Sequence, residues 1–263
     1  MLIPVGYGLN CEDETTYAFQ MLGAKVDQIF LKDLIENPSV LDDYQILVMI
    51  GGFSFGDHIA AGKVLANLYK FKLHDPIQRF IADGKLILGE CNGFQVLVKA
   101  GILPGLDGDS TTQSATLTYN DSGVFEDRWV RLRVNVKSRC VFTKGLKELN
   151  LPVRHGEGKF VVRNDVILQR LKDGNQIVLQ YADAEGLPTM SYPQNPNGSI
   201  EAIAGICDST GRIFGKMPHT TAYLSPYNHP QWTRWKARDD RFKEGEGVHI
   251  VRNAIEYVER NFV

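Results

Sequence analysis

The sequence has no hydrophobic run that approaches the ~20 residues of a membrane-spanning helix. It also has no excess of either charge, since 29 basic and 31 acidic residues leave a net charge of −2. A nucleic acid or an anionic membrane is therefore not expected as a partner. Internal repeats and low-complexity tracts are absent, and the opening stretch "MLIPVGYGLN" lacks the basic residues of a signal peptide.

Cysteine is scarce, and the spacing of the cysteines does not match a common metal site. The four cysteines (Cys11, Cys91, Cys140 and Cys207) lie far apart, and no two form a CxxC pair. This pattern excludes a disulfide framework and the usual zinc-site spacing. It fits a protein of the reducing cytoplasm, which is the location that we expect.

Apolar runs alternate with helical patterns through the first 101 residues. Continuous apolar runs indicate strands buried on both faces, as in a parallel sheet, and their alternation with helices indicates βαβ units. The expected strands are 2–8, 26–31, 44–52 and 85–91, and the expected helices are 12–24, 61–71, 75–84 and 92–101. The pattern predicts an α/β fold with a doubly wound, mostly parallel sheet.

In the middle of the chain, the period at which apolar residues recur changes. Polar and apolar residues alternate over 114–120 and 128–142, which predicts antiparallel strands inserted into the fold. A helix, a strand, a hairpin and a final helix are expected at 163–174, 176–183, 202–219 and 247–262. We predict a single domain over 1–263, with residues 225–263 as a C-terminal extension packed on it.

The stretch "GECNGFQ", residues 89–95, places a cysteine between two glycines where a predicted strand meets a predicted helix. G-x-C-x-G is the cysteine form of a nucleophile elbow. The helix N-terminus favours a thiolate, and its free N–H groups can stabilise an oxyanion, with the N–H of Asn92 as the natural first donor. A buried cysteine in an ordinary turn is the alternative on this pattern alone.

A cysteine nucleophile needs a base, and the chain has six histidines. His219 is the first candidate, because it follows an apolar strand at the edge where open α/β sheets hold their active sites. His155, in "RHGEGKF", is the second. The stretch from Gly56 to Lys63 resembles a phosphate loop, but its spacing is one residue too long and Val64 stands where Ser or Thr is required.

Several motifs resemble one family. The nucleophile motif is similar to that of class I glutamine amidotransferases, and further stretches resemble the glutaminase subunits of phosphoribosylformylglycinamidine synthase. These stretches, in order, are "GLNCEDET", "GGFSFGDHIAAGK", "GECNGFQVL", "RHGEGKF" and "NPNGSIEAIAGICDSTGRIFGKMPH". The resemblance implies a flavodoxin-like sheet with an antiparallel insert.

The resemblance also implies roles for residues. Cys91 would attack the side-chain amide of glutamine to form a thioester, and His219 would take the thiol proton and protonate the departing ammonia. The N–H groups of Gly52 and Asn92 would form the oxyanion hole. Gln95, Gly156 and Glu157 would help to hold the substrate.

The remaining chemistry would belong to partners. Ammonia would pass to a synthetase subunit that makes formylglycinamidine ribonucleotide in purine biosynthesis, with a small accessory subunit as an optional third component. ATP and Mg²⁺ would bind the synthetase, so no cofactor and no metal is expected in this chain.

One position departs from the family pattern. The family has a glutamate two residues after the histidine, and this chain has Thr221 there. We predict either a Cys91–His219 dyad in which Thr221 orients the ring weakly, or a carboxylate from a distant Asp or Glu. Two alternative functions follow: a non-catalytic structural subunit, which Thr221 favours, and a hydrolase of another amide, which Gln95 and "NPNGS" disfavour.

Overall fold

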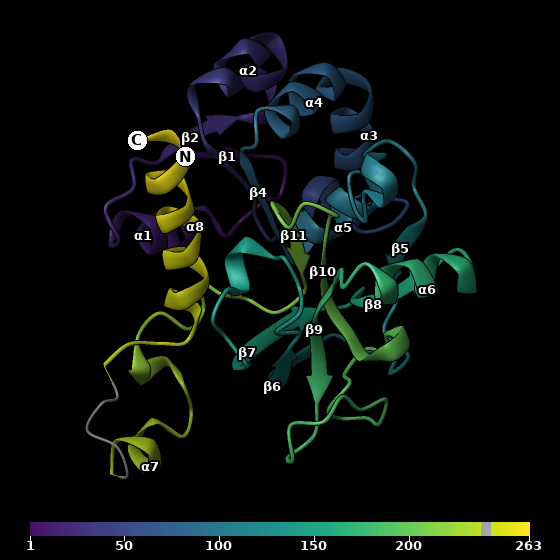
Figure 1. Cartoon of the computed structure of the whole chain (residues 1–263), viewed down its shortest axis with the longest axis vertical. Helices are drawn as coiled ribbons and strands as arrows, with labels where there is room; N and C mark the ends of the chain where they lie inside the picture. Colours follow the sequence, from purple (N-terminus) through teal and green to yellow (C-terminus); the bar gives the residue numbers. More distant parts are fainter. Residues whose placement is uncertain (238–242) are drawn as a thin grey trace.

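The computed structural model of the protein, drawn in Figure 1, describes residues 1–237 and 243–263. The strands are β1 (Leu2–Val5), β2 (Asp27–Phe30), β3 (Ile46–Met49), β4 (Leu86–Glu90), β5 (Ala115–Thr118), β6 (Glu126–Val134), β7 (Glu148–His155), β8 (Lys159–Val162), β9 (Ile177–Ala182), β10 (Ile203–Cys207) and β11 (Ile213–Lys216). The helices are α1 (Glu12–Gln20), α2 (Leu31–Glu36), α3 (Lys63–Lys72), α4 (His74–Ala82), α5 (Asn92–Ala100), α6 (Asp165–Asp173), α7 (Trp232–Lys236) and α8 (Gly247–Phe262).

A nine-stranded sheet in the order β2-β1-β3-β4-β11-β10-β9-β6-β7 forms the centre of the molecule. The pairings from β2 through β11 are parallel, and those from β11 through β7 are antiparallel. This arrangement confirms the predicted α/β fold, a mostly parallel sheet with an antiparallel part. Because β1, β3, β4 and β11 run the same way, the residues that follow them meet at one edge of the sheet.

Each central strand contributes to two hydrophobic layers. In β3, Val48 packs on one face while Leu47 and Met49 pack on the other, and in β4 Leu88 and Ile87 divide in the same way. The alternation explains why these strands read as continuous apolar runs.

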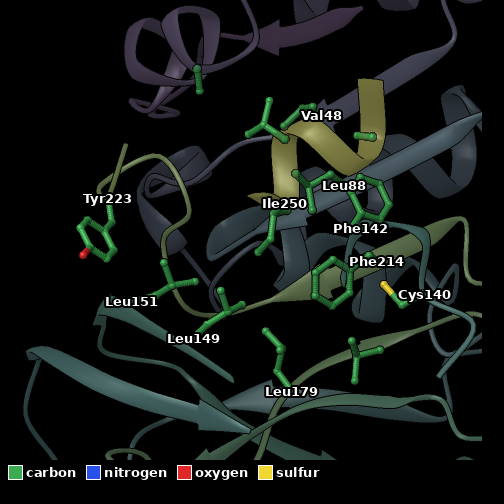
Figure 2. Packing of buried hydrophobic residues seen from close by; sticks show 14 of the residues in the cluster. Val48, Leu88, Cys140, Phe142, Leu149, Leu151, Leu179, Phe214, Tyr223 and Ile250 are labelled. Atoms are coloured by element: carbon green, nitrogen blue, oxygen red, sulfur yellow. The ribbon is translucent and has the colours of Figure 1, made fainter. Parts of the chain in front are cut away.

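Different helices cover the two faces. Side chains of α3, α4 and α5 cover one face, and side chains of α1 and α8 cover the other. Figure 2 shows the second layer, where Ile250 of α8 lies near Val48 and Leu88, with Phe142 and Phe214 beside them.

The antiparallel part differs from the prediction in its bounds. The strand expected over 128–142 ends at Val134, and the chain then turns and forms a short 3-10 helix, Val141–Thr143. The strand β7 was not expected, yet it pairs with β6 from Glu126↔His155 to Arg133↔Glu148. Strands β5 and β8 form a separate two-stranded sheet.

An aromatic cluster joins the C-terminal part to the antiparallel strands. The ring of His229 stacks on Trp235 at 3.7 Å between centroids and meets Trp129 of β6 at 4.4 Å. Trp129 also contacts Tyr223. Further along, α8 buries Val248, Ile250, Val251 and Ala254 in the core. Residues 238–242 of the predicted extension lie outside the described residues. No helix within the described ranges is long and apolar enough to cross a membrane.

Candidate active site

Cys91 lies at a sharp turn between β4 and α5. Its backbone has φ 53° and ψ −108°, a strained conformation for a residue with a side chain. The glycines on either side are required by close packing: a Cβ on Gly89 would lie 2.5 Å from Cδ1 of Leu97, and one on Gly93 would clash with the Met49 carbonyl. The local geometry is therefore that of a nucleophile elbow.

A cavity of about 360 Å³ opens at the carboxyl edge of the parallel strands, in front of Cys91. Segments that follow β1, β3, β4, β7 and β11 contribute to it. The lining residues are Asn10, Cys11, Glu14, Gly52, Phe53, Asp57, Cys91, Gln95, Tyr119, Phe125, Arg154, His155, Gly156, Glu157 and His219. The structure thus brings Cys91, His219, Gly52, Gln95, Gly156 and Glu157 around one space, and Asn92 immediately follows Cys91.

The thiol of Cys91 is protonated in the resting structure. Burial, followed by the nearby charge of Glu90, raises the pKa of Cys91 to about 12, against a smaller opposite effect from the N–H of Asn92. The helix N-terminus alone therefore does not produce a thiolate here. A thiol in this setting needs a base within reach before it can attack.

His219 provides a neutral imidazole beside the thiol. Burial lowers the pKa of His219 to about 4, although the charge of Glu90 acts in the opposite direction. Its Nε2 atom is buried and has no hydrogen-bond partner among the described residues. Its Nδ1 atom faces Oε1 of Glu90 at 3.6 Å. A free Nε2 on a neutral ring is the arrangement that a general base requires.

Gly51 lies between these two side chains. A Cβ on Gly51 would lie 3.5 Å from Cβ of Cys91, 3.2 Å from Cε1 of His219 and 3.0 Å from Sγ of Cys11. Only a residue without a side chain leaves the space between the thiol and the imidazole open.

Glu90 accepts hydrogen bonds from the segment that carries His219. Its Oε2 atom accepts from Nζ of Lys216 at 2.5 Å and from the N–H of Thr220 at 2.8 Å, and its Oε1 atom accepts from Oγ1 of Thr221 at 3.2 Å. Burial would raise the pKa of Glu90, but the charges of Lys216 and His219 and the hydrogen bonds from Lys216 and the N–H of Thr220 lower it to about 2. Glu90 is therefore an ionised carboxylate. Thr221 donates to Glu90, and its hydroxyl does not bond to the His219 ring.

The backbone around Gly52 has an unused donor. Leu9 and Gly52 form an isolated antiparallel bridge. Its two hydrogen bonds run from the N–H of Asn10 to the Gly51 oxygen and from the N–H of Phe53 to the Gly8 oxygen. The N–H of Gly52 therefore makes no backbone bond within the described part of the chain. Gly52 has φ 134°, and a Cβ there would meet the Gly8 carbonyl oxygen at 2.6 Å. Another residue would not fit.

Gln95 and Glu157 are held by other protein groups. Nε2 of Gln95 donates to the backbone oxygen of Glu157 at 2.6 Å, and its Oε1 accepts from Nδ2 of Asn92 at 3.0 Å. The carboxylate of Glu157 accepts from the N–H of Ala61 and lies 3.7 Å from Lys99. These bonds fix the cavity wall, which includes Gly156, to the start of α5.

His155, the second candidate base, has both ring nitrogens engaged. Its Nδ1 lies 3.0 Å from Oδ1 of Asn120, and its Nε2 lies 3.4 Å from Nδ2 of Asn197. Burial lowers the pKa of His155 to about 3. The ring covers Gly158, where a Cβ would clash with it. Asn197 and Ser199 of "NPNGS" thus stabilise the "HGEG" segment, since Ser199 also donates to the Gly158 oxygen at 3.3 Å.

Sequence reasoning missed Glu90 and Asp57. Asp57 accepts from Nδ2 of Asn92 at 3.1 Å and from the N–H of Gly62 at 3.3 Å, and so connects the loop after β3 to the elbow. Glu90 had a visible signal: an acidic residue ends one buried strand, "KLILGEC", and a lysine ends another, "RIFGK". Opposite charges at the ends of two apolar strands indicate a buried pair.

No group of three or more His, Cys, Asp or Glu side chains could hold a metal ion within residues 1–237 and 243–263.

The chain is similar to known proteins of one family. Residues 1–258 match the CobB/CobQ-like glutamine amidotransferase domain. The chain is 44% identical to phosphoribosylformylglycinamidine synthase subunit PurQ of Dehalococcoides mccartyi, over 95% of this chain and 94% of that protein. It is 42% identical to the subunit of the same name from Methanococcus maripaludis, over 98% and 96%.

Solved structures show the same fold. A chain in the structure of PurLQS from Thermotoga maritima superposes with a TM-score of 0.71 at 27% identity, covering 98% of this chain and 97% of that chain. A glutamine amidotransferase from the same organism has a TM-score of 0.54 at 16% identity, over 97% and 95% of the two chains, and shares the fold.

Proposed function

Because this chain belongs to the glutamine amidotransferase family that contains phosphoribosylformylglycinamidine synthase subunit PurQ, we propose that it hydrolyses glutamine through Cys91 and His219. The ammonia would feed a synthetase subunit that makes formylglycinamidine ribonucleotide in purine biosynthesis. The observation that carries the proposal is a strained cysteine elbow beside a buried histidine whose Nε2 has no partner among the described residues.

In the first step, Nε2 of His219 takes the proton of the Cys91 thiol as Sγ attacks the side-chain amide carbon of glutamine. The low pKa of His219, about 4, supports this role because the ring is neutral at pH 7. Negative charge develops on the amide oxygen. The unused N–H of Gly52 and the N–H of Asn92 would stabilise that oxyanion.

In the second step, the imidazolium of His219 gives its proton to the amide nitrogen, and the C–N bond breaks to release ammonia. A γ-glutamyl thioester remains on Cys91. Water then attacks the thioester carbon and gives a proton to His219, the C–S bond breaks, and the returned proton restores the thiol while glutamate leaves.

The mouth of the cavity carries charges that suit the other end of glutamine. Arg154 is exposed there and Glu14 is partly buried, so they could pair with the α-carboxylate and the α-ammonium respectively. Gln95, Gly156 and Glu157 would act by fixing the wall against which the side chain of glutamine lies.

Exposed aromatic residues surround the mouth, and they support a partner at this place. Phe53, Tyr119 and Phe125 line the cavity with exposed fractions of 48%, 69% and 51%. Tyr7 stacks on Phe55 at 4.8 Å nearby. Tyr7 and Phe55 both have positive φ values. A synthetase that covers this rim would shield the rings and receive ammonia where it forms.

The remaining assignments follow from this role. We place the chain in the cytoplasm and assign it no cofactor, with ATP and Mg²⁺ bound by the synthetase and a small accessory subunit as an optional third component. We also propose that residues 225–263 act as an extension of a single domain over 1–263, anchored by Trp235, His229 and α8.

The decisive experiment measures ammonia release from glutamine by the chain assembled with its synthetase. Cys91→Ala should abolish glutamine-dependent synthesis and leave ammonia-dependent synthesis intact. Cys11→Ala, which removes another thiol from the same cavity, is the matched control and should retain glutamine-dependent activity. Full glutamine-dependent activity in Cys91→Ala would contradict the mechanism.

A second measurement tests the partner. Glutaminase activity of the isolated chain should be weak and should rise strongly when the synthetase and its nucleotides are added, since closure of the site would depend on the partner. Equal turnover in both conditions would contradict this dependence. No glutaminase activity in either condition would favour a structural subunit.

A further inference from the structure

The carboxylate nearest to His219 comes from an unexpected position. Two residues after the histidine, Thr221 has no charge, but Oε1 of Glu90 lies 3.6 Å from Nδ1 of His219. Glu90 is the residue directly before the nucleophile, and its exposed fraction is 4%. A buried carboxylate on the far nitrogen of a base orients the ring and stabilises the imidazolium that forms.

We propose that Glu90 is a positioning residue that orients His219 and balances its charge, in place of a carboxylate at position 221. The inference rests on the proposed function, because it assigns the third member of the same site. Glu90 acts through the imidazole and does not contact the substrate.

Two features of the fold place the Glu90 side chain at His219. Glu90 pairs with Lys216 in the parallel register of β4 and β11, and paired residues project from the same face of a sheet. The chain then turns at Cys91, so the side chains of Glu90 and Cys91 do not point to opposite faces as they would in a continuing strand. The thiol faces the cavity while the carboxylate lies behind the imidazole.

Hydrogen bonds fix the carboxylate on the segment that carries the base. Thr220 and Thr221, which follow His219, both donate to Glu90, and the N–H of His219 donates to the Pro152 oxygen at 2.7 Å. Thr221 therefore has a defined task. Its hydroxyl holds Oε1, and its small size leaves room for Glu90 where a second carboxylate would be repelled.

A competing explanation is that Glu90 only neutralises Lys216. The two form a buried ion pair at 2.5 Å, and Lys216 is fully buried. Removing one member of a buried pair leaves an unpaired charge and destabilises a protein for that reason alone. The test must separate this effect from an effect on His219.

The first variant is Glu90→Gln, assayed as glutamine hydrolysis by the chain assembled with its synthetase. We expect kcat to fall by roughly 10²- to 10³-fold, because a neutral amide cannot balance the positive charge of the imidazolium. The KM for glutamine should stay within about 3-fold.

The second variant, Glu90→Gln with Lys216→Gln, removes both charges of the pair. We expect it to regain the thermal stability lost in Glu90→Gln without regaining kcat. The third, Glu90→Gln with Thr221→Glu, returns a carboxylate from the other side of the ring. We expect it to recover at least about 10-fold in kcat.

The pH profile gives an independent readout. His219 faces Glu90 and Lys216, with Arg154 and Asp127 as the other charged groups that act on it. Loss of the Glu90 charge should move the acidic limb of kcat/KM to lower pH, a change that a folding defect does not cause.

Two results would overturn the inference: Glu90→Gln with kcat within about 3-fold of wild type, or full return of kcat in the doubly neutral variant. Failure of the proposed function is distinguished by Cys91→Ala. If that variant remains active with glutamine, the reaction does not use this site, whatever Glu90→Gln does.

Discussion

His155 and His219 are buried histidines that line the same cavity, and their ring nitrogens have different surroundings. His155 has an amide group at each nitrogen, from Asn120 and Asn197. His219 has the carboxylate of Glu90 near Nδ1, and its Nε2 has no partner among the described residues. Burial lowers both pKa values, to about 3 and about 4.

The difference separates a structural histidine from one that can transfer a proton. Protonating Nε2 of His155 would place a second donor against the Nδ2 group of Asn197, so that amide would have to reorganise. Protonating His219 places a cation beside the carboxylate of Glu90, which is already negatively charged. Burial alone therefore does not identify a base; the partners of each nitrogen do.

The largest effect should come from removing the base itself. We expect His219→Gln to lower kcat for glutamine hydrolysis by about 10³-fold or more, because general base catalysis by the ring is lost. The variant should remain folded by circular dichroism, since Nε2 has no partner to lose within the described residues. Near-normal kcat in His219→Gln would make His155 the next residue to test.

An intermediate effect should come from Gly51→Ala. The new Cβ would lie 3.2 Å from Cε1 of His219 and 3.5 Å from Cβ of Cys91, so it would displace the ring from the thiol. We expect kcat to fall by roughly 10- to 100-fold, in line with the cost of small misplacements in active sites. The measurement is single-turnover thioester formation, and an unchanged rate would show that the space between the two groups is not needed.

The matched change at the other histidine, His155→Gln, should affect stability instead. It removes a hydrogen-bonded ring that covers Gly158. We expect the free energy of unfolding in urea to fall by about 1–3 kcal/mol. The kcat should stay within about 3-fold. A loss of kcat as large as that of His219→Gln would erase the distinction between the two residues.

The last expected effect is in the pH dependence of stability. Folded pKa values of about 3 and 4 lie below the usual value of 6.5, so between these values the unfolded chain binds more protons. The free energy of unfolding should therefore be highest above about pH 6.5 and fall as pH drops toward 3, by at most about 1.4 kcal/mol per unit for each histidine. His155→Gln should flatten this slope, and an unchanged slope would contradict the assignment.

Much of the fold follows from local pattern. The strands β1, β3 and β4 and the helices α3, α5 and α8 lie where the period of apolar residues predicts them. The pattern failed after Val134, because the alternation of residue types continues into a segment that forms a turn instead of a strand. It also missed β7, which depends on its pairing with β6.

Some features of the site could likewise be predicted from local sequence, and others could not. The elbow at Cys91 was predictable, because G-x-C-x-G between a strand and a helix constrains the backbone locally. The partners of His155, the unused N–H of Gly52 and the carboxylate behind His219 depend on segments that are distant in sequence. Gln95 and Glu157 were predicted to help to hold the substrate, but the hydrogen bond between them was visible only in three dimensions.

The sequence by itself determined the type of sheet and the elbow at Cys91, and it singled out His219 by its place just past an apolar strand, because each depends on local period or on a short motif. Only the tertiary structure decided which groups surround each ring. Residue 90 reaches His219 because β4 pairs with β11 in one register and the chain turns at Cys91. The turn follows from a short motif, but the register is set by the packing of the whole sheet, so no short stretch of sequence contains it.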